Sequence, residues 1–183
     1  WQALRWRCDS DQDSDVKHPR TTMVTIAPCR FGYLLVAATE RGVCAVALGD
    51  DPHMLQNDLD LRHTGCVSDH WTGTILDYLN GVRQHLDLPL DVEATPFQRL
   101  VWEALRSIPY GATQTYQEVA QRLGRPDAVR AVARACASNP VALIVPCHRV
   151  VRSDGTPGGY RWGIERKRAL LAHEAAHVQL CAS

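Results

Sequence analysis

Residues 146 to 150 read Pro146-Cys147-His148-Arg149-Val150 and place a thiol beside an imidazole at the end of an apolar run. A cysteine is a strong nucleophile only as the thiolate, and a neighbouring imidazole or cation favours that form. Pro146 keeps the preceding residue out of the helical region, so the chain is expected to enter this segment extended, with adjacent side chains on opposite faces. Cys147 and His148 can then cooperate only through an immediate backbone turn or a bridging water. A buried structural cysteine beside a surface histidine is the alternative.

Charge is distributed unevenly along the chain. Residues 1–90 carry 8 Lys and Arg against 12 Asp and Glu, whereas residues 91–183 carry 12 against 8, so the net charge of zero conceals −4 and +4. Phosphate neutralisation supplies most of the non-specific affinity of proteins for nucleic acids. The second half is therefore expected to bind a polyanion, with a solvated arginine-rich face as the alternative.

Composition limits the class of protein. The 183 residues are 45% hydrophobic, which suffices for a packed core in one or two small domains. No apolar run reaches the length of a membrane span, and no secretory signal is visible. The seven cysteines have no paired spacing, which indicates neither a disulfide framework nor a four-cysteine zinc site and favours a reducing cytoplasm.

The first half predicts a tail followed by a small sheet. Residues 1 to about 20 are polar and acidic, and they cannot bury a core. Two runs rich in Val, Leu and Ala, residues 33–38 and 43–48, are separated by four residues and predict an antiparallel hairpin. Helices are expected over residues 58–61 and 75–79, and residues 86–90 are expected to form an extended connector.

A capping signal opens the first helix of the second half. Thr95 is followed by Pro96 at the first helical position and by Gln98 three residues after the cap. Apolar residues at helical spacing then predict a face that lies in the core, formed by Phe97, Leu100, Val101, Ala104, Leu105 and Ile108.

Two further helices follow in a helix-turn-helix pattern. Thr115 and Glu118 form another capping box for a helix to Leu123, and Gly124 ends it. A third helix is predicted over residues 126–138. A helix, a short turn with glycine and a second helix are typical of DNA-binding proteins.

The composition of the third helix indicates how it would recognise DNA. It is rich in alanine, including Ala131, and it carries Arg130 and Arg134 four residues apart on one face. It contains no Asn or Gln that could read adenine with two hydrogen bonds. We therefore expect binding to double-stranded DNA with little sequence preference, although an alanine-rich core helix is the alternative.

The segment 139–151, Asn139-Pro140-Val141-Ala142-Leu143-Ile144-Val145-Pro146-Cys147-His148-Arg149-Val150-Val151, followed by Gly159-Tyr160-Arg161-Trp162-Gly163, resembles the O6-alkylguanine-DNA alkyltransferases. Residues 115–120 and 128–132 fall in the order and spacing of that family. The likeness spans about residues 25–174 and is strongest to the C-terminal part of the bacterial Ada-type members. It implies a tail or linker (1–22), an N-terminal α/β domain with a small antiparallel, ribonuclease-H-like sheet (23–90), and a helical C-terminal domain with the helix-turn-helix (91–183).

The resemblance implies repair by direct reversal of damage. Cys147 would accept, once, the methyl group of O6-methylguanine in duplex DNA after the base has flipped out of the stack. A water linked to His148 would take the thiol proton, and Glu174 would orient that histidine. A helical period places Glu174 on an inward stripe with Lys167, which either reaches outward to solvent or lies near the thiol. Whether O4-methylthymine is also a substrate is left open.

The resemblance also implies roles in binding. Tyr116 would hydrogen-bond the purine edge and crowd the adjoining phosphate, Arg130 would fill the gap left by the flipped base, and Asn139 would tie the recognition helix to the active-site strand. The residues implied to contact DNA are Arg130, Ala131, Arg134, Asn139 and Arg149. Those implied to bind the damaged base are Val150, Tyr160, Arg161 and Trp162.

Departures from the family pattern bear on metal and substrate. Thr39 and Cys44 stand where two ligands of a structural zinc would align, so we expect neither a metal nor any cofactor. Ala142 and Trp162 stand where members with an open pocket have proline and glycine. If the indole folds over the site, a benzyl group should fit poorly.

The protein is expected to be a monomer in the bacterial cytoplasm, at the nucleoid and without membrane contact.

Three competing functions follow from the same residues. His173-Glu174-Ala175-Ala176-His177 matches the His-Glu-x-x-His pattern of zinc proteases, but such a site needs a third protein ligand and only six residues follow. A non-catalytic module that senses alkylated bases is disfavoured because Cys147 is present. A thiol hydrolase is disfavoured because Cys147 and His148 are adjacent.

Overall fold

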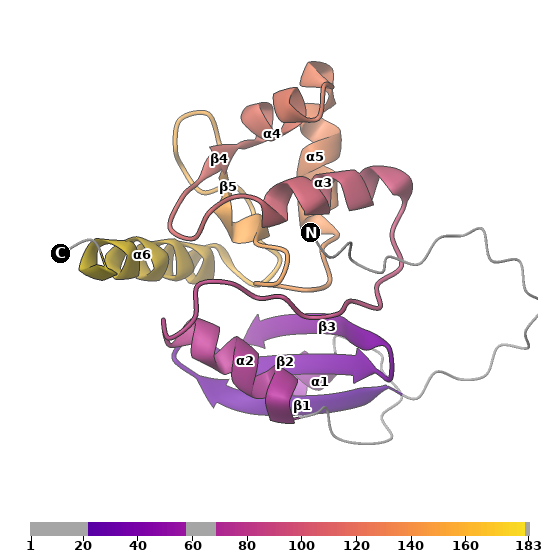
Figure 1. Cartoon of the computed structure of the whole chain (residues 1–183), viewed down its shortest axis with the longest axis vertical. Helices are drawn as coiled ribbons and strands as arrows, with labels where there is room; N and C mark the ends of the chain where they lie inside the picture. Colours follow the sequence, from indigo (N-terminus) through magenta and orange to yellow (C-terminus); the bar gives the residue numbers. More distant parts are fainter. Residues whose placement is uncertain (1–21, 58–68, 182–183) are drawn as a thin grey trace, which may run out of the picture.

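A three-stranded antiparallel sheet forms the first half of the molecule (Figure 1). The computed structural model describes residues 22–57 and 69–181. The strands are β1 (Met23–Cys29), β2 (Gly32–Thr39) and β3 (Gly42–Gly49), paired in the order β1-β2-β3. The predicted hairpin is confirmed, because β2 and β3 contain the two apolar runs and pair antiparallel. The predicted helix at residues 58–61 and the predicted tail, apart from residue 22, lie outside the described residues.

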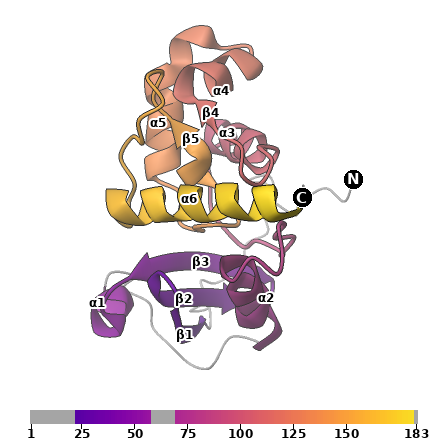
Figure 2. The ribbon, with the colours of Figure 1, turned by 90° about the vertical axis from the view of Figure 1, so that its left-hand side faces the viewer.

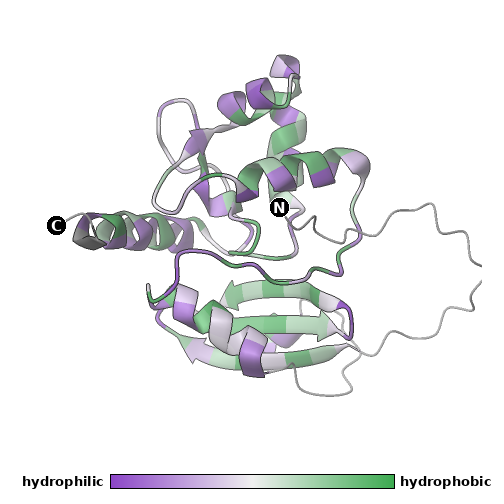
Figure 3. Cartoon of the chain, viewed as in Figure 1, coloured by the Kyte–Doolittle hydropathy of each residue, from purple (hydrophilic) through white to green (hydrophobic). Residues whose placement is uncertain are grey.

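Both faces of this sheet are covered. Leu34 and Val36 of β2 face the main core, whereas Leu35 and Ala37 face a second cluster, since successive strand residues point to opposite sides. Helix α2 (Asp69–Leu79) packs on the first face, and α1 (Pro52–Asn57) covers the second through Leu55. Figure 2 shows α1 to the left and α2 to the right of the sheet, and Figure 3 shows the strands as the most continuous hydrophobic segments. The helix predicted at residues 75–79 is confirmed within α2.

The first helix of the second half is α3 (Pro96–Arg106), and its predicted capping box is present. Thr95 Oγ1 accepts from the Gln98 amide, and Gln98 Oε1 accepts from the Thr95 amide. Val101 and Leu105 are fully buried, as the pattern predicted. Leu100 is 46% exposed, so its placement on the core face was wrong; it lies at the edge of the apolar stripe.

The two following helices pack together and against α3. Helix α4 (Tyr116–Arg122) has the predicted Thr115–Glu118 capping box, and Gly124 takes a φ of +68° that allows the chain to turn. The third helix differs at its start, because a 3₁₀ turn η1 (Pro126–Ala128) precedes α5 (Val129–Ala137). The indole of Trp102 on α3 fixes α5 by donating to the Ala135 carbonyl over 2.8 Å.

The segment after α5 joins the two halves. Val46 of β3 donates to the Pro140 carbonyl over 2.9 Å, and its own carbonyl accepts from the Ala142 amide over 3.0 Å. Val43 and residue 90 form a similar bridge, which holds the end of the predicted connector extended against β3. One hydrophobic cluster therefore runs from the sheet into the helical half. The division of the chain at residue 90 remains a proposal.

The last elements surround the cysteine motif. A 3₁₀ turn η2 (Cys147–Arg149) leads into the short strand β5 (Val150–Val151), which pairs parallel with β4 (Gln114–Thr115). The long helix α6 (Ile164–Cys181) then crosses between the sheet and the helical half (Figure 2). Within residues 22–57 and 69–181, no helix has both the length and the apolar character needed to cross a membrane.

Candidate active site

The backbone turns immediately at Cys147, and this turn places the thiol. Of the two ways to connect Cys147 and His148, the structure adopts the turn: residues 147–149 form the 3₁₀ helix η2. The side chain of Asn139, which follows α5, donates through Nδ2 to the Val145 carbonyl (2.9 Å) and to Cys147 Sγ (3.2 Å). Its Oδ1 accepts from the Val141 amide over 3.0 Å. Asn139 therefore holds the turn and the thiol together.

His148 is fully buried and pairs with Glu174 from α6. The distance between His148 Nε2 and Glu174 Oε1 is 2.7 Å. His148 Nδ1 is buried and has no hydrogen-bond partner among the described residues. The ring therefore has one nitrogen engaged by a carboxylate and a second that is free to receive a proton.

Glu174 collects five hydrogen-bond donors. Oε1 accepts from His148, from Tyr78 Oη (2.5 Å) and from Arg149 Nη2 (3.1 Å), while Oε2 accepts from Arg149 Nε (2.9 Å) and the Gly111 amide (3.0 Å). A carboxylate that is only 1% exposed requires such partners. Its orientation is therefore fixed by three separate segments of the chain.

Arg149 has a different place from the DNA contact expected of it. Its side chain is 6% exposed, and besides Glu174 it donates to the Ile108 carbonyl (2.7 Å) and to Tyr78 Oη (2.8 Å). The 3₁₀ turn directs this guanidinium inward, where the buried carboxylate compensates its charge. The structure thus corrects the prediction that Arg149 contacts DNA, because protein groups enclose its side chain.

The charges in this site are strongly coupled. Burial acts to raise the pKa of Glu174, but hydrogen bonds and charges from His148 and Arg149 outweigh it and hold that pKa well below its usual range. Burial lowers the pKa of His148, against the opposing effect of Glu174. Burial raises the pKa of the Cys147 thiol, while the hydrogen bond from Asn139 and the charge of Lys167 act in the opposite direction. In the resting arrangement the thiol and the imidazole are thus both favoured as neutral groups.

Lys167 is a second buried cation near the thiol. Its side chain is fully buried, and Nζ donates to the Val150 carbonyl over 2.5 Å. Burial lowers its pKa, and the neighbouring thiols of Cys147 and Cys136 act to raise it. Of the two alternatives for this residue, the structure adopts the one near the thiol.

The aromatic residues of the motif lie around the same turn. Tyr116, at the start of α4, is half-buried, and a Cβ at Gly158 would lie 2.6 Å from its hydroxyl, so a larger residue there would displace the Tyr116 side chain. Burial, together with the thiols of Cys136 and Cys147, raises the pKa of Tyr116 to about 12. The ring of Tyr160 stands edge-on to His148, with centroids 6.5 Å apart, and is followed by Trp162 at 5.1 Å.

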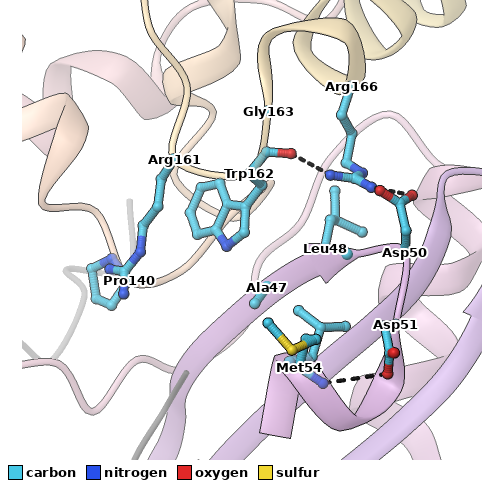
Figure 4. A pocket seen from close by; sticks show the side chains of 12 residues that line it. Ala47, Leu48, Asp50, Asp51, Met54, Pro140, Arg161, Trp162, Gly163 and Arg166 are labelled. Atoms are coloured by element: carbon cyan, nitrogen blue, oxygen red, sulfur yellow. Dashed lines mark hydrogen bonds and ion pairs between the residues drawn. The ribbon is translucent and has the colours of Figure 1, made fainter. Parts of the chain in front are cut away.

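Trp162 lies in a separate pocket of about 320 Å³, beside the sheet (Figure 4). The lining includes Ala47, Pro140, Arg161 and Arg166, but neither Cys147 nor His148. The indole also packs against both hydrophobic clusters. The expectation that it folds over the thiol is therefore corrected: Trp162 packs against Tyr160, whose ring in turn stands edge-on to His148.

The remaining predicted residues lie on the outside of the helical half or in the core. Arg130 and Arg134 are exposed on α5, Ala131 beside them is half-buried, and Arg161 is exposed in the loop before α6. Val150 is fully buried, and its carbonyl is the acceptor for Lys167. The structure thus brings together Asn139, Cys147, His148 and Glu174, and it leaves the two arginines of α5 at the surface.

The metal-protease pattern does not assemble into a ligand set in the part of the chain that the structure describes. There, no group of three or more His, Cys, Asp or Glu residues could hold a metal ion. His177 Nδ1 bonds to the His173 carbonyl, and His173 Nδ1 accepts from Arg30 over 2.9 Å. Glu174 between them points into the His148 network. At the position where a zinc ligand would align, Thr39 donates to Asp91 over 2.7 Å.

Comparison with known proteins shows which proteins this chain resembles. Residues 96–176 match the model of the DNA binding domain of 6-O-methylguanine DNA methyltransferase. The chain is 48% identical over 161 residues to the bifunctional transcriptional activator/DNA repair enzyme Ada of Escherichia coli, covering 84% of this chain and 46% of that protein. It is 47% identical over 119 residues to the methylated-DNA--protein-cysteine methyltransferase of Mycobacterium tuberculosis, covering 60% of this chain and 72% of that protein.

A solved structure shares the fold. The Mycobacterium tuberculosis OGT in complex with DNA superposes with a TM-score of 0.74 at 34% identity, covering 86% of this chain and 94% of that one. The chain thus spans less than half the length of the Ada protein it matches and nearly all of the solved structure.

Proposed function

The chain belongs to the family of the O6-methylguanine DNA methyltransferases, and we propose that it repairs O6-methylguanine in duplex DNA by transferring the methyl group to Cys147. The observation that carries the proposal is the contact of Asn139 with Cys147 Sγ beside the buried His148–Glu174 pair. A cysteine, a base and an orienting carboxylate are the elements of an activated nucleophile.

The proposed reaction is an in-line displacement at the methyl carbon. The thiol proton passes through a water to His148 Nδ1, and Glu174 stabilises the imidazolium that results. The Sγ–CH₃ bond forms as the bond from the methyl group to guanine O6 breaks, and the Tyr116 hydroxyl protonates the leaving purine. The proton that His148 holds then passes through water to the Tyr116 phenolate and restores its hydroxyl. In sum, the methyl group moves to sulfur and the thiol proton to guanine. The thioether is stable, so each molecule reacts once.

The resting protein disfavours the thiolate, since burial raises the pKa of Cys147 and lowers that of His148. Proton transfer from Cys147 to His148 does not leave an uncompensated positive charge in the core. The imidazolium would lie 2.7 Å from the carboxylate of Glu174, which is already ionised. Glu174 therefore compensates the one positive charge that the reaction creates. The network with Arg149 keeps that carboxylate in place.

DNA is proposed to lie along α4 and α5, used as a helix-turn-helix. Arg130 and Arg134 project from α5, and the alanines beside them permit a close approach to the groove. Arg130 is proposed to fill the gap left by the flipped base, while Tyr116, Tyr160 and the loop carrying Arg161 and Trp162 surround that base. Contacts to the phosphates, without reading of base edges, would give little sequence preference.

The N-terminal domain is proposed to be a small member of the ribonuclease-H-like folds, comprising residues 23–90. The protein is proposed to act as a monomer in a reducing cytoplasm, at the nucleoid, because the reaction uses one free thiol and its substrate is chromosomal DNA. Cys29, Cys136 and Cys147 form no disulfide bond.

Incubation with a duplex that holds one O6-methylguanine tests the proposal. Mass spectrometry is expected to find one added methyl group on the peptide with Cys147, with no more than one mole of product per mole of protein. Cys147→Ser is expected to transfer nothing above background while binding DNA nearly as well, because a hydroxyl is a far poorer nucleophile. Methyl transfer by the serine variant would refute the assignment of Cys147.

A further inference from the structure

A tyrosine from the first half of the chain touches the carboxylate of the proposed relay. Tyr78 lies on α2, outside the segment 96–176 that matches the family model, and is 96 residues from Glu174. Its hydroxyl donates to Glu174 Oε1 over 2.5 Å and accepts from Arg149 Nη2 over 2.8 Å. We propose that Tyr78 is a positioning residue for methyl transfer, acting through Glu174; the proposal rests on the function proposed above.

The direction of the Tyr78 hydroxyl is fixed by its neighbours. Arg149 has no lone pair to offer, so it must donate to the phenol oxygen, and the phenol proton then points at Glu174. The same Oε1 accepts from His148 Nε2. Tyr78 and His148 therefore hold one oxygen from two sides, and a rotation of the carboxylate would break both bonds.

The surroundings keep Tyr78 in this position. Its side chain is 2% exposed, and its ring stands edge-on to Tyr110 with centroids 5.6 Å apart. Burial and the negative charge of Glu174 raise its pKa well above the ordinary value, so the hydroxyl stays protonated and remains a donor. A phenol that cannot ionise is suited to orient a carboxylate without exchanging its proton.

The contact also links the two halves of the molecule. Glu174 and Arg149 belong to α6 and η2, whereas Tyr78 lies in the last turn of α2, which packs on the sheet. The N-terminal half thus supplies a hydrogen bond to the Glu174 carboxylate, which stabilises the His148 imidazolium. This gives it a part in the reaction besides covering the core.

The test compares Tyr78→Phe with the wild type and with Tyr33→Phe, which removes a hydroxyl from β2 in the same half of the chain. The pH dependence of Cys147 alkylation by iodoacetamide is followed by mass spectrometry of the Cys147 peptide, which requires no DNA. Without the phenol the carboxylate turns more freely and stabilises the imidazolium less well. Tyr78→Phe is therefore expected to react about tenfold to a hundredfold more slowly at pH 7, with its profile displaced to higher pH.

Tyr33→Phe is expected to keep the wild-type profile. A merely structural tyrosine would lower thermal stability and leave the profile of the folded protein unmoved, so an unmoved profile, or one displaced to lower pH, overturns the proposal. Since iodoacetamide tests the thiol directly, this result is independent of whether O6-methylguanine proves to be the substrate. A wild type that transfers no methyl group from DNA would refute the proposed function and leave the Tyr78 test intact.

A measurement on the wild type keeps the proposal testable if Tyr78→Phe does not fold. Ring-labelled tyrosine allows the Tyr78 Cζ resonance to be followed by NMR. It is expected to titrate with the same midpoint as the alkylation profile, because Tyr78 and His148 share one oxygen. A Tyr78 resonance that stays constant through that midpoint would overturn the proposal.

Discussion

Arg149 and Glu174 form an ion pair inside the protein, with 2.9 Å between Arg149 Nε and Glu174 Oε2. The preceding residue, His148, binds the other oxygen of the same carboxylate. Two consecutive side chains can reach one group because η2 is a tight turn, in which neighbouring residues diverge by far less than in a strand. The carboxylate therefore compensates the permanent charge of Arg149, and in the proposed reaction it would also stabilise the transient imidazolium of His148.

Glu174→Gln is expected to slow alkylation of Cys147 and to displace its pH profile upward. The lost negative charge favours neutral His148, so less thiolate forms at a given pH. The exposed Glu165→Gln on the same helix is the matched control and should behave as the wild type. Stopped-flow or quench measurements of methyl transfer between pH 6 and 9 provide the check; a profile unchanged in height and position would remove Glu174 from the relay.

Acid is expected to destabilise the protein through the same group. The pKa of folded Glu174 is held below its unfolded value of about 4.3, so its stabilising effect is present above that pH and is lost as the pH falls toward the folded pKa. Glu174→Gln should be about 3–5 kcal/mol less stable at pH 7, because Arg149 is left as an uncompensated buried charge. Urea unfolding at several pH values should show the two proteins converging as the pH decreases below about 4. A constant difference would contradict this.

Asn139→Ala is expected to lower the stability of the fold and to make the Cys147 thiol less reactive. It removes three hydrogen bonds in the core, to Val141, Val145 and Cys147, and should cost about 1–3 kcal/mol of unfolding free energy. The donor to Sγ favours the thiolate, so the pKa of Cys147 should rise further. Iodoacetamide alkylation measures the second effect and urea unfolding the first. A destabilised variant with an unaltered thiol profile would show that Asn139 supports only the turn.

Arg130→Ala is expected to slow transfer from duplex DNA by far more than transfer from free O6-methylguanine. The side chain is proposed to replace a flipped base, and a free base needs no flipping. Arg41→Ala, which removes an exposed arginine from the β2–β3 turn, should affect neither substrate. Single-turnover rates on the two substrates give the comparison. Equal losses on both would show that Arg130 does not assist flipping.

Trp162→Gly is expected to raise reactivity with O6-benzylguanine at least about tenfold, which corresponds to about 1.4 kcal/mol of barrier, while reaction with O6-methylguanine changes little. The indole abuts Tyr160, whose ring stands against His148, so removing it frees Tyr160 to make room for a ring-sized group. Loss of protein thiol on titration with the benzylated base measures the effect. Rapid inactivation of the wild type by that base would show that Tyr160 does not limit the pocket.

The sequence by itself determined the local structure and indicated the cysteine that we propose as the nucleophile. The capping boxes at Thr95 and Thr115 are formed by residues three apart, so their hydrogen bonds are readable without any tertiary contact. The β2–β3 hairpin follows for the same reason from two apolar runs and a short turn. The Cys147 motif is contiguous, and this made the family resemblance specific.

Only the tertiary structure decided where the side chains of the site point. The order Pro-Cys-His-Arg allows an extended strand or a turn, and the 3₁₀ turn is stabilised by Asn139 and Glu174, which lie 8 and 26 residues away from their partners in that turn. The same turn buries Arg149, and packing against the sheet draws Trp162 away from the thiol. Tyr78 carries no motif. Its contact with Glu174 exists because α2 and α6 pack in one core across 96 residues, and no local pattern encodes a contact of that separation.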